Sequence, residues 1–246
     1  MHRRILLNVR LFLAAFVCLI LQSASYAQTP AVLQINRVAP KPGDEGKYQE
    51  ILRERKELCV RVDCPPYLVL QPLAELPFSA AYKMGNPYMY DRKAVNELWQ
   101  LTGFESIEER DRVAKYYRTL HPYLRQMPVA MTSTAWLNYH PDPNRGVAWG
   151  MDHSRFLVIV VTEDKPSTDG TIFENGIVQI TVSSADSRAE AEEIATASRS
   201  QAVVFAVRRD LSLPAKSWIV ADPDFWAKPT SEKDIRAVID PDQMPQ

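Results

Sequence analysis

The order of apolar patterns along residues 32 to 139 constrains the fold more than any other feature of this sequence. Apolar and polar side chains alternate over residues 32 to 38, which predicts a strand. After the corner Pro42-Gly43, apolar residues recur at three- and four-residue steps as far as Val62, which predicts a helix with one charged, solvated face. The other elements predicted here are strands at residues 67–73, 78–84 and 129–139 and a helix from residue 107 to Met127-Pro128.

This order, β-α-β-β-α-β, is that of the ferredoxin-like or split βαβ unit, a four-stranded antiparallel sheet with both helices on one face. The second half of the chain has a related but incomplete pattern. Its predicted elements are strands at residues 156–162, 176–182, 202–208 and 216–221, a helix at 186–200 and a short helix within 231–240. We therefore predict an α+β protein of two ferredoxin-like units, the second degenerate. Their open sheet faces pack together, within one chain as an internal pseudo-dimer or across a homodimer.

The first 27 residues have the features of a secretory signal peptide. Three arginines within the first ten residues precede an uncharged run of eleven residues, and a small-residue sequence typical of a cleavage site ends at Ala27. A membrane-spanning helix needs about 20 apolar residues, so we expect cleavage after Ala27 rather than anchoring. We predict a periplasmic or secreted protein in three parts: the signal peptide 1–27, a ferredoxin-like domain 28–146, and a second, degenerate α+β domain 147–246.

The charge balance excludes nucleic acid as a partner. The 246 residues include 29 basic and 30 acidic side chains, and three of the basic ones leave with the signal peptide, so the mature chain is acidic. Hydrophobic residues make up 46% of the sequence, and after residue 27 no apolar run is long enough to span a membrane. We expect the mature protein to be soluble.

Two cysteines remain in the mature chain, Cys59 and Cys64, in the sequence CVRVDC. An even pair in a chain bound for an oxidising compartment is typical of a disulfide. A turn at Pro65-Pro66 could bring the two Cα atoms within the roughly 4.4 to 6.8 Å that a disulfide needs. Two thiols packed under a helix end are the alternative interpretation, and a metal site is not predicted because no histidine lies near in sequence.

Two segments resemble a known superfamily. The sequence VLQINRVAPKPGDEGKYQEILRERKEL is similar to the opening of dimeric α/β-barrel proteins, which include the antibiotic-biosynthesis monooxygenases and the NIPSNAP proteins, and LTGFESIEERDR resembles the region of their third strand. The matching residues are Lys41, Pro42, Gly43, Tyr48, Phe104, Ser106 and Glu109. The resemblance covers residues 31 to 140 and implies a sheet whose open face packs on another sheet to enclose a cavity. It does not name the contents of that cavity.

Some members of this superfamily degrade haem with an asparagine on the first strand, a tryptophan, and an iron-binding histidine on the second helix. The resemblance assigns the first and last of these roles to Asn36 and His121, which are our predicted catalytic residues. No tryptophan lies at a comparable place in the second helix, because Trp99 precedes the helix start. We therefore predict no bound cofactor, with haem as the alternative.

Further residues are candidate ligand-binding groups. Gln34 shares a strand face with Asn36, and polar groups that face an enclosed cavity need partners or a ligand. Three tyrosines beside two basic residues could line a pocket for an anionic or aromatic ligand, or else cover the core at a hairpin edge. They are Tyr82, Tyr88 and Tyr90.

Other chemistry has less support in the sequence. His140 and His153 flank a loop rich in Asp and Pro, but their spacing matches no metal signature, so we expect exposed turn residues and no metal. The sequence holds no G-x-S-x-G elbow, P-loop or G-x-G-x-x-G motif.

These observations predict a small-ligand-binding or accessory protein with a cavity between sheets. One alternative is a small monooxygenase or isomerase of the dimeric α/β-barrel type, cofactorless or haem-using. Another is an interaction protein that uses an open sheet face. Convergence of Gln34, Asn36 and His121 on one concave pocket would favour the enzyme, whereas a pocket filled by apolar side chains would favour the accessory protein.

Overall fold

The computed structural model describes residues 29–61, 64–73, 97–119, 129–140, 154–162, 170–176, 178–198 and 201–227. The strands of this part of the chain are β1 (Val32–Pro40), β2 (Tyr67–Pro72), β3 (Leu98–Phe104), β4 (Val129–His140), β5 (Phe156–Thr162), β6 (Thr171–Glu174), β7 (Gln179–Ala185) and β8 (Gln201–Val207). The helices are α2 (Glu45–Arg61), α4 (Ile107–Thr119), α6 (Arg188–Ala197), α7 (Lys216–Ala221) and α8 (Pro223–Trp226). None of these helices is both long and apolar enough to cross a membrane.

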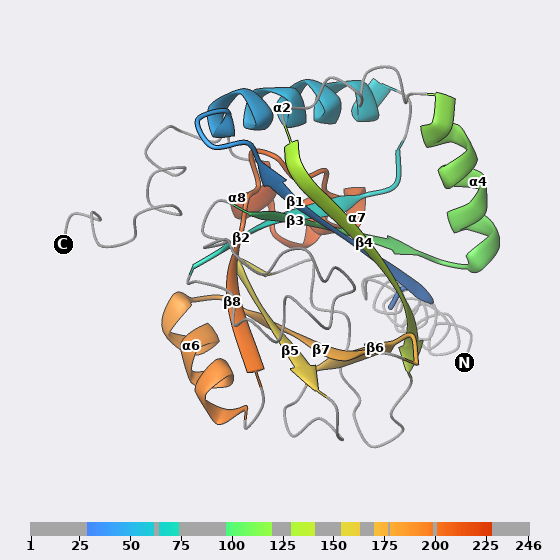
Figure 1. The fold of residues 1–246 in the computed structure, drawn as a ribbon. Helices are drawn as coiled ribbons and strands as arrows, with labels where there is room; N and C mark the ends of the chain where they lie inside the picture. The colour runs from blue at the N-terminus through green and yellow to red at the C-terminus, as the bar shows by residue number, and fades with distance from the viewer. Residues whose placement is uncertain are drawn as a thin grey trace, which may run out of the picture.

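The eight strands close one antiparallel barrel in the order β1-β3-β2-β8-β5-β7-β6-β4 (Figure 1). Two seams join the strands of the first half of the chain to those of the second. Each seam is short: β2 pairs with β8 through three residue pairs, and β4 pairs with β6 through three.

This closure corrects the predicted fold class. We expected two ferredoxin-like units, each an antiparallel sheet with helices on one face, packed face to face. The structure instead shows a single closed barrel, because edge strands of both halves hydrogen-bond to each other and leave no separate sheets. The seams pair segments more than 30 residues apart, and no local sequence pattern encodes such a pairing.

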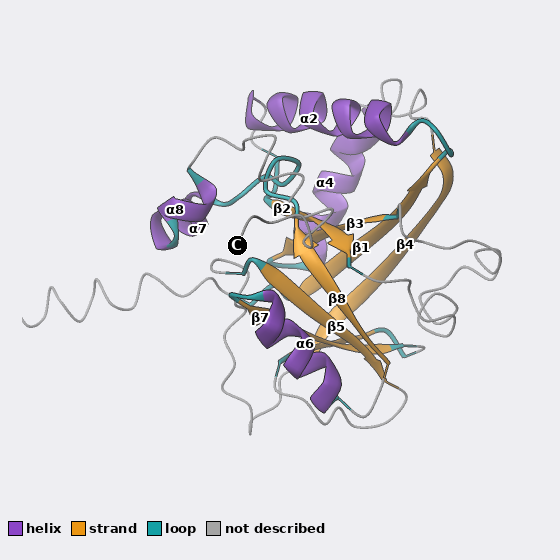
Figure 2. Cartoon of the chain, turned by 90° about the vertical axis from the view of Figure 1, so that its left-hand side faces the viewer, coloured by secondary structure: helices purple, strands orange, loops and turns teal. Residues whose placement is uncertain are grey.

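The barrel has one apolar core inside it and helices outside it. The core includes Leu33 and Ile35 of β1, Trp99 of β3, Ile159 of β5 and Phe205 of β8, all without solvent exposure. Outside, α2 packs through its buried residues on the outer side of β2 and β3, and α6 packs against β5 and β8 (Figure 2). Each strand therefore divides its alternating side chains between the core and an outer layer.

Local signals place the helices where the sequence predicts them. Gly43 has φ of 87°, the left-handed conformation that the corner before α2 needs. At the start of α4 the Glu109 N–H donates to Ser106 Oγ at 3.1 Å, and Glu109 Oε2 accepts from the Glu105 N–H at 2.7 Å, which is a capping box. Ser187 and Glu190 form the same arrangement at the start of α6.

Three predicted elements differ from the structure or lie outside it. The predicted third strand, residues 78–84, lies outside the described residues, and the third strand described is β3. The strand predicted at residues 216–221 is wrong, since these residues form α7, which buries Trp218 against the core. The strand predicted at residues 176–182 lies mainly in β7, and β6 before it was not predicted.

A cluster of charged side chains connects α2 to the residues that follow β8. Arg208 is buried and donates to both carboxylate oxygens of Asp210, at 2.9 and 2.8 Å, while Arg53 of α2 donates to the same carboxylate at 3.2 Å. Lys56 Nζ donates to the Arg209 carbonyl at 2.8 Å. Burial alone would raise the pKa of Asp210, but the hydrogen bonds and charges of Arg208 and Arg53 outweigh it and hold this pKa below its ordinary value.

A second buried ion pair lies at one end of the barrel. Arg37 of β1 donates through Nη2 to Glu97 Oε2 at 3.0 Å and through Nε to the other carboxylate oxygen, and both side chains are at most 1% exposed. The guanidinium also lies 4.9 Å from the ring centroid of Trp99. A charge this deep is tolerated because it is paired.

Removing one partner of this pair should destabilise the fold. Glu97→Gln removes the carboxylate charge that pairs with the buried Arg37 guanidinium, so we expect a loss of about 3 to 5 kcal/mol in the free energy of unfolding, measured by urea denaturation. The double variant Arg37→Met/Glu97→Leu buries no charge and should recover much of the loss. A Glu97→Gln protein as stable as the wild type would contradict this account.

Asp210 should make stability depend on pH in the acid range. The pKa of Asp210 in the folded protein lies below the unfolded value of about 3.9. Its contribution to stability is therefore present above about pH 3.9 and is lost as pH falls through the folded pKa. The stability difference between wild type and Asp210→Asn should therefore be largest near neutral pH and shrink below about pH 4. The matched control is Glu57→Gln, which removes an exposed carboxylate 3.9 Å from Arg61 and should change little. If the difference in free energy of unfolding between the wild type and Asp210→Asn did not change with pH, the prediction would be contradicted.

Candidate functional site

Gln34 and Asn36 lie on the outer face of the barrel. They alternate along β1 with Leu33 and Ile35, which belong to the core, so their side chains project away from the interior. The two residues share a face, as the alternation predicts. That face is the helix-covered exterior, and not the enclosed cavity for which we proposed them.

Asn36 is held in place by two neighbours. Its Oδ1 accepts hydrogen bonds from Gln34 Nε2 at 3.1 Å and from Thr134 Oγ1 of β4 at 2.8 Å. No described residue bonds to Asn36 Nδ2 or to Gln34 Oε1, and both side chains are half-buried. A fixed amide donor and a fixed amide acceptor therefore lie side by side where solvent reaches them.

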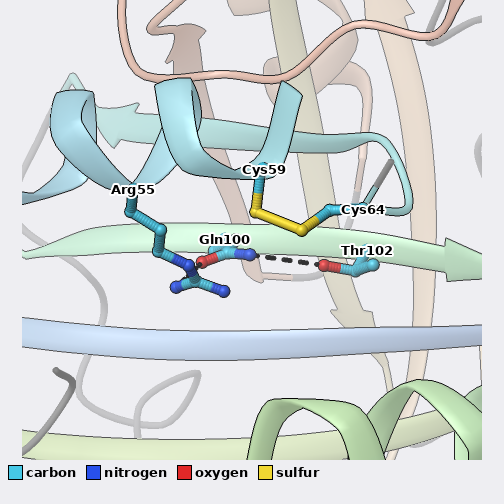
Figure 3. Close-up of a disulfide and its surroundings, with 5 residues drawn as sticks. All are labelled: Arg55, Cys59, Cys64, Gln100 and Thr102. Atoms are coloured by element: carbon cyan, nitrogen blue, oxygen red, sulfur yellow. Dashed lines mark hydrogen bonds between the residues drawn. A yellow bond between two sulfur atoms is a disulfide. The ribbon is translucent and has the colours of Figure 1, made fainter. Parts of the chain in front are cut away.

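The polar row continues across β3 toward α2. Asn36 is opposite Gln100 and Gln34 is opposite Thr102 in the β1–β3 register. Gln100 Nε2 donates to Thr102 Oγ1 at 3.5 Å, and Gln100 Oε1 accepts from Arg55 Nη1 of α2 at 3.1 Å (Figure 3). We call these residues the outer polar strip: Gln34, Asn36, Arg55, Gln100, Thr102 and Thr134.

Aromatic rings flank the strip. The Arg55 guanidinium lies 5.7 Å from the ring centroid of Tyr67, and Trp136, opposite Gln34 on β4, has the Arg110 guanidinium of α4 at 5.3 Å. The strip thus lies between two arginine–aromatic contacts, one from α2 and one from α4. It offers amide and hydroxyl groups with positive charge at both sides.

The predicted disulfide is present at the α2 end of this region. Cys59 and Cys64 are bonded with Cα atoms 4.9 Å apart, and the Cys64 N–H donates to the Cys59 carbonyl at 3.0 Å. The bond joins the last turn of α2 to the start of β2, beside Gln100 and Thr102 (Figure 3). It therefore fixes the helix that carries Arg55 over the strip.

The described core cluster inside the barrel is made of hydrophobic side chains, with the Arg37–Glu97 ion pair buried beside Trp99. Trp99, which we considered for haem chemistry, is one of the core residues and stacks near Phe205 with ring centroids 4.8 Å apart.

The structure does not describe five of the predicted residues. His121, His153, Tyr82, Tyr88 and Tyr90 lie outside the described residues, so their roles stay predictions. His140 is exposed at the end of β4, where Nδ1 lies 3.0 Å from Glu174 Oε1. Within the residues described, no group of three His, Cys, Asp or Glu side chains could hold a metal ion.

Sequence reasoning missed four residues of the strip: Arg55, Gln100, Thr102 and Thr134. In the sequence LWQLTGF, polar Gln100 and Thr102 alternate with apolar Trp99 and Leu101, which is the pattern of a half-buried strand. Assigning a strand there would have placed Gln100 and Thr102 on one face.

The fold and the strip define a closed eight-stranded antiparallel barrel with helices outside it. No protein-family model matches the chain, and a comparison with curated proteins found no match either. Among solved structures, one titled "Crystal structure of putative monooxygenase from Lactobacillus acidophilus NCFM" aligns with 73% of this chain and 94% of its own, at 7% sequence identity and a TM-score of 0.39. Neither an activity nor a family follows from similarity at this level.

Reduction of the disulfide should weaken the fold moderately. The bond closes a short loop between residues five apart, so its loss should cost roughly 2 kcal/mol. We expect the free energy of unfolding of Cys59→Ser/Cys64→Ser, measured by urea denaturation, to be lower than that of the wild type by this amount. Mass spectrometry of the oxidised wild type should give a mass lower by two hydrogen atoms than after reduction, and free thiols in the oxidised protein would contradict the assignment.

Proposed function

We propose that the mature chain is a small-ligand-binding or accessory protein of the periplasm or exterior, and that its ligand contacts the outer polar strip. The observation that carries this proposal is that a donor, Asn36 Nδ2, lies beside an acceptor, Gln34 Oε1, on a framework fixed by Thr134, and no described residue bonds to either group. Fixed donors and acceptors lose little conformational freedom on binding. The described core of the barrel is hydrophobic, so the polar groups that could hold a polar ligand lie on its outer face.

The chemistry of the strip favours a polar, uncharged or anionic ligand. An amide donor beside an amide acceptor matches a peptide group, a carboxamide or neighbouring hydroxyls. Arg55 would attract a ligand that also carries negative charge, whereas the Arg110 guanidinium is paired with Asp111 Oδ1 at 2.7 Å. The strip includes no carboxylate that would attract a cation.

The disulfide supports the proposed location. The Cys59–Cys64 disulfide is characteristic of oxidising compartments. It agrees with the signal peptide that we predict for residues 1–27.

The alternative function, a small monooxygenase or isomerase, has less support from this geometry. It needs Asn36 to face an enclosed site, and Asn36 faces the outside of the barrel. We therefore propose no cofactor, and a haemin titration tests this choice: an absorption spectrum of haemin unchanged by the protein supports it, and a shifted Soret band contradicts it.

The test of the strip combines native mass spectrometry with two matched variants. We expect the wild type, purified from the periplasm, to retain a small-molecule mass that Asn36→Ala loses, because Asn36 supplies the free donor. Gln179→Ala removes a half-buried strand amide on the opposite half of the barrel and should retain it. If no mass is retained, the side-chain amide NMR signals of Asn36 and Gln34 are followed during addition of N-acetylglucosamine and of N-acetylalanine amide.

Selective shifts of these two signals would support a site on the strip. Equal retention by wild type and Asn36→Ala, or the absence of both a retained mass and any shift, would contradict the proposal.

A further inference from the structure

The indole N–H of Trp99 is a buried donor for which the described residues supply no acceptor. The side chain lies in the barrel core without solvent exposure, and its Nε1 has no hydrogen-bond partner among them. The centroid of the ring lies 4.9 Å from the Arg37 guanidinium and 4.8 Å from the ring centroid of Phe205, so two neighbours set its orientation. Because buried polar groups nearly always bond to protein or to an ordered water, this donor indicates a binding position beside it.

The buried ion pair brings further polar groups to the same place. Arg37 is opposite Trp99 in the β1–β3 register, and its guanidinium contacts both the Trp99 ring and the Glu97 carboxylate. Arg37 and Glu97 neutralise each other in a pair with two hydrogen bonds. A charged ligand at this place would therefore be buried without a counter-charge, so the position favours an uncharged group.

The Glu97 carboxylate narrows the chemistry further. Each of its oxygens accepts one hydrogen bond from Arg37, whereas an ionised carboxylate offers about four lone-pair sites. A group that serves both side chains has to accept from Trp99 Nε1 and donate to Glu97. A hydroxyl can do both, whereas a carbonyl oxygen only accepts and an ammonium only donates.

The spacing suits a single bridging oxygen. Glu97 and Trp99 are two residues apart at the start of β3, which places their Cα atoms about 7 Å apart in an extended chain. One oxygen with two hydrogen bonds of about 2.8 Å each can link side chains that start from this separation.

We propose that Arg37, Glu97 and Trp99 form an interior site that binds one uncharged hydroxyl group, which accepts from Trp99 Nε1 and donates to Glu97. Water is the smallest molecule with this chemistry, and the hydroxyl of a small neutral alcohol is the other source. The site is separate from the outer polar strip, because Arg37 lies on the face of β1 opposite to Gln34 and Asn36. The inference is therefore independent of the proposed function.

Nuclear magnetic resonance of the wild type with isotope-labelled indole nitrogens tests the site directly. We expect a dipolar cross-peak from Trp99 Hε1 to a proton that does not belong to the protein. The sign of the peak in a rotating-frame experiment separates such a contact from proton exchange. A peak at the water frequency identifies water, and a peak at another frequency, together with a retained mass in native mass spectrometry, identifies a small alcohol.

Two matched variants connect this signal to the donor. Trp99→Phe keeps an aromatic ring beside Arg37 and Phe205 and removes only the indole donor from this place. It should lose one long-lived internal water in magnetic relaxation dispersion, or else the retained alcohol mass. Trp218→Phe removes an indole from the same core cluster, where Trp218 stacks near Trp226, and should leave both measurements unchanged.

Two results would overturn the inference. One is a wild type in which Trp99 Hε1 has dipolar contacts with protein protons alone; this result does not depend on whether either variant folds. The other is a number of long-lived waters and a retained mass that are the same in Trp99→Phe as in the wild type, or that change equally in Trp218→Phe.

Discussion

The structure depends on the closure of the barrel through two short seams, and the seams are not equally supported. Beside the β2–β8 seam, buried Arg208 binds Asp210 and also reaches Gln71 of β2 at 3.4 Å and Gln49 of α2 at 3.1 Å. Beside the β4–β6 seam stands the exposed pair His140–Glu174. Exposed ion pairs contribute little, whereas buried bidentate contacts fix geometry. The barrel is therefore most firmly closed on the side of α2 and least firmly on the side of β4.

Local patterns predicted most elements but not their assembly. The helix periods of α2, α4 and α6 and the alternation of β1 are properties of contiguous residues, so they can be recognised in the sequence. α7 was misassigned because six residues with apolar Trp218 and Ile219 fit a short strand as well as a short helix. The barrel itself escaped prediction since its seams are non-local, and their three-residue pairings have no sequence signature.

For the candidate site, the sequence predicted which residues share a face but not which face it is. Both faces of β1 carry apolar side chains: Val32 and Val38 lie with Gln34 and Asn36, and Leu33 and Ile35 lie opposite. Only the packing of β1 against the other strands decides which set is enclosed. The sequence therefore could not decide whether Gln34 and Asn36 lie inside the barrel or outside it, and the structure places them on the outer face. The disulfide, in contrast, was predictable as one of two interpretations, since it is set by two cysteines five residues apart.

The polar groups proposed to hold a ligand lie on the outer surface of the barrel, and the residue of β4 that orients them is Thr134. Its hydroxyl donates to Asn36 Oδ1 and helps to orient the free amide of the strip. With Oδ1 of Asn36 bonded to both Gln34 and Thr134, the side-chain amide has one favoured orientation. A ligand that accepts a hydrogen bond from Asn36 Nδ2 would not have to supply that ordering, so the loss of Thr134 should weaken binding even though Thr134 itself need not touch the ligand.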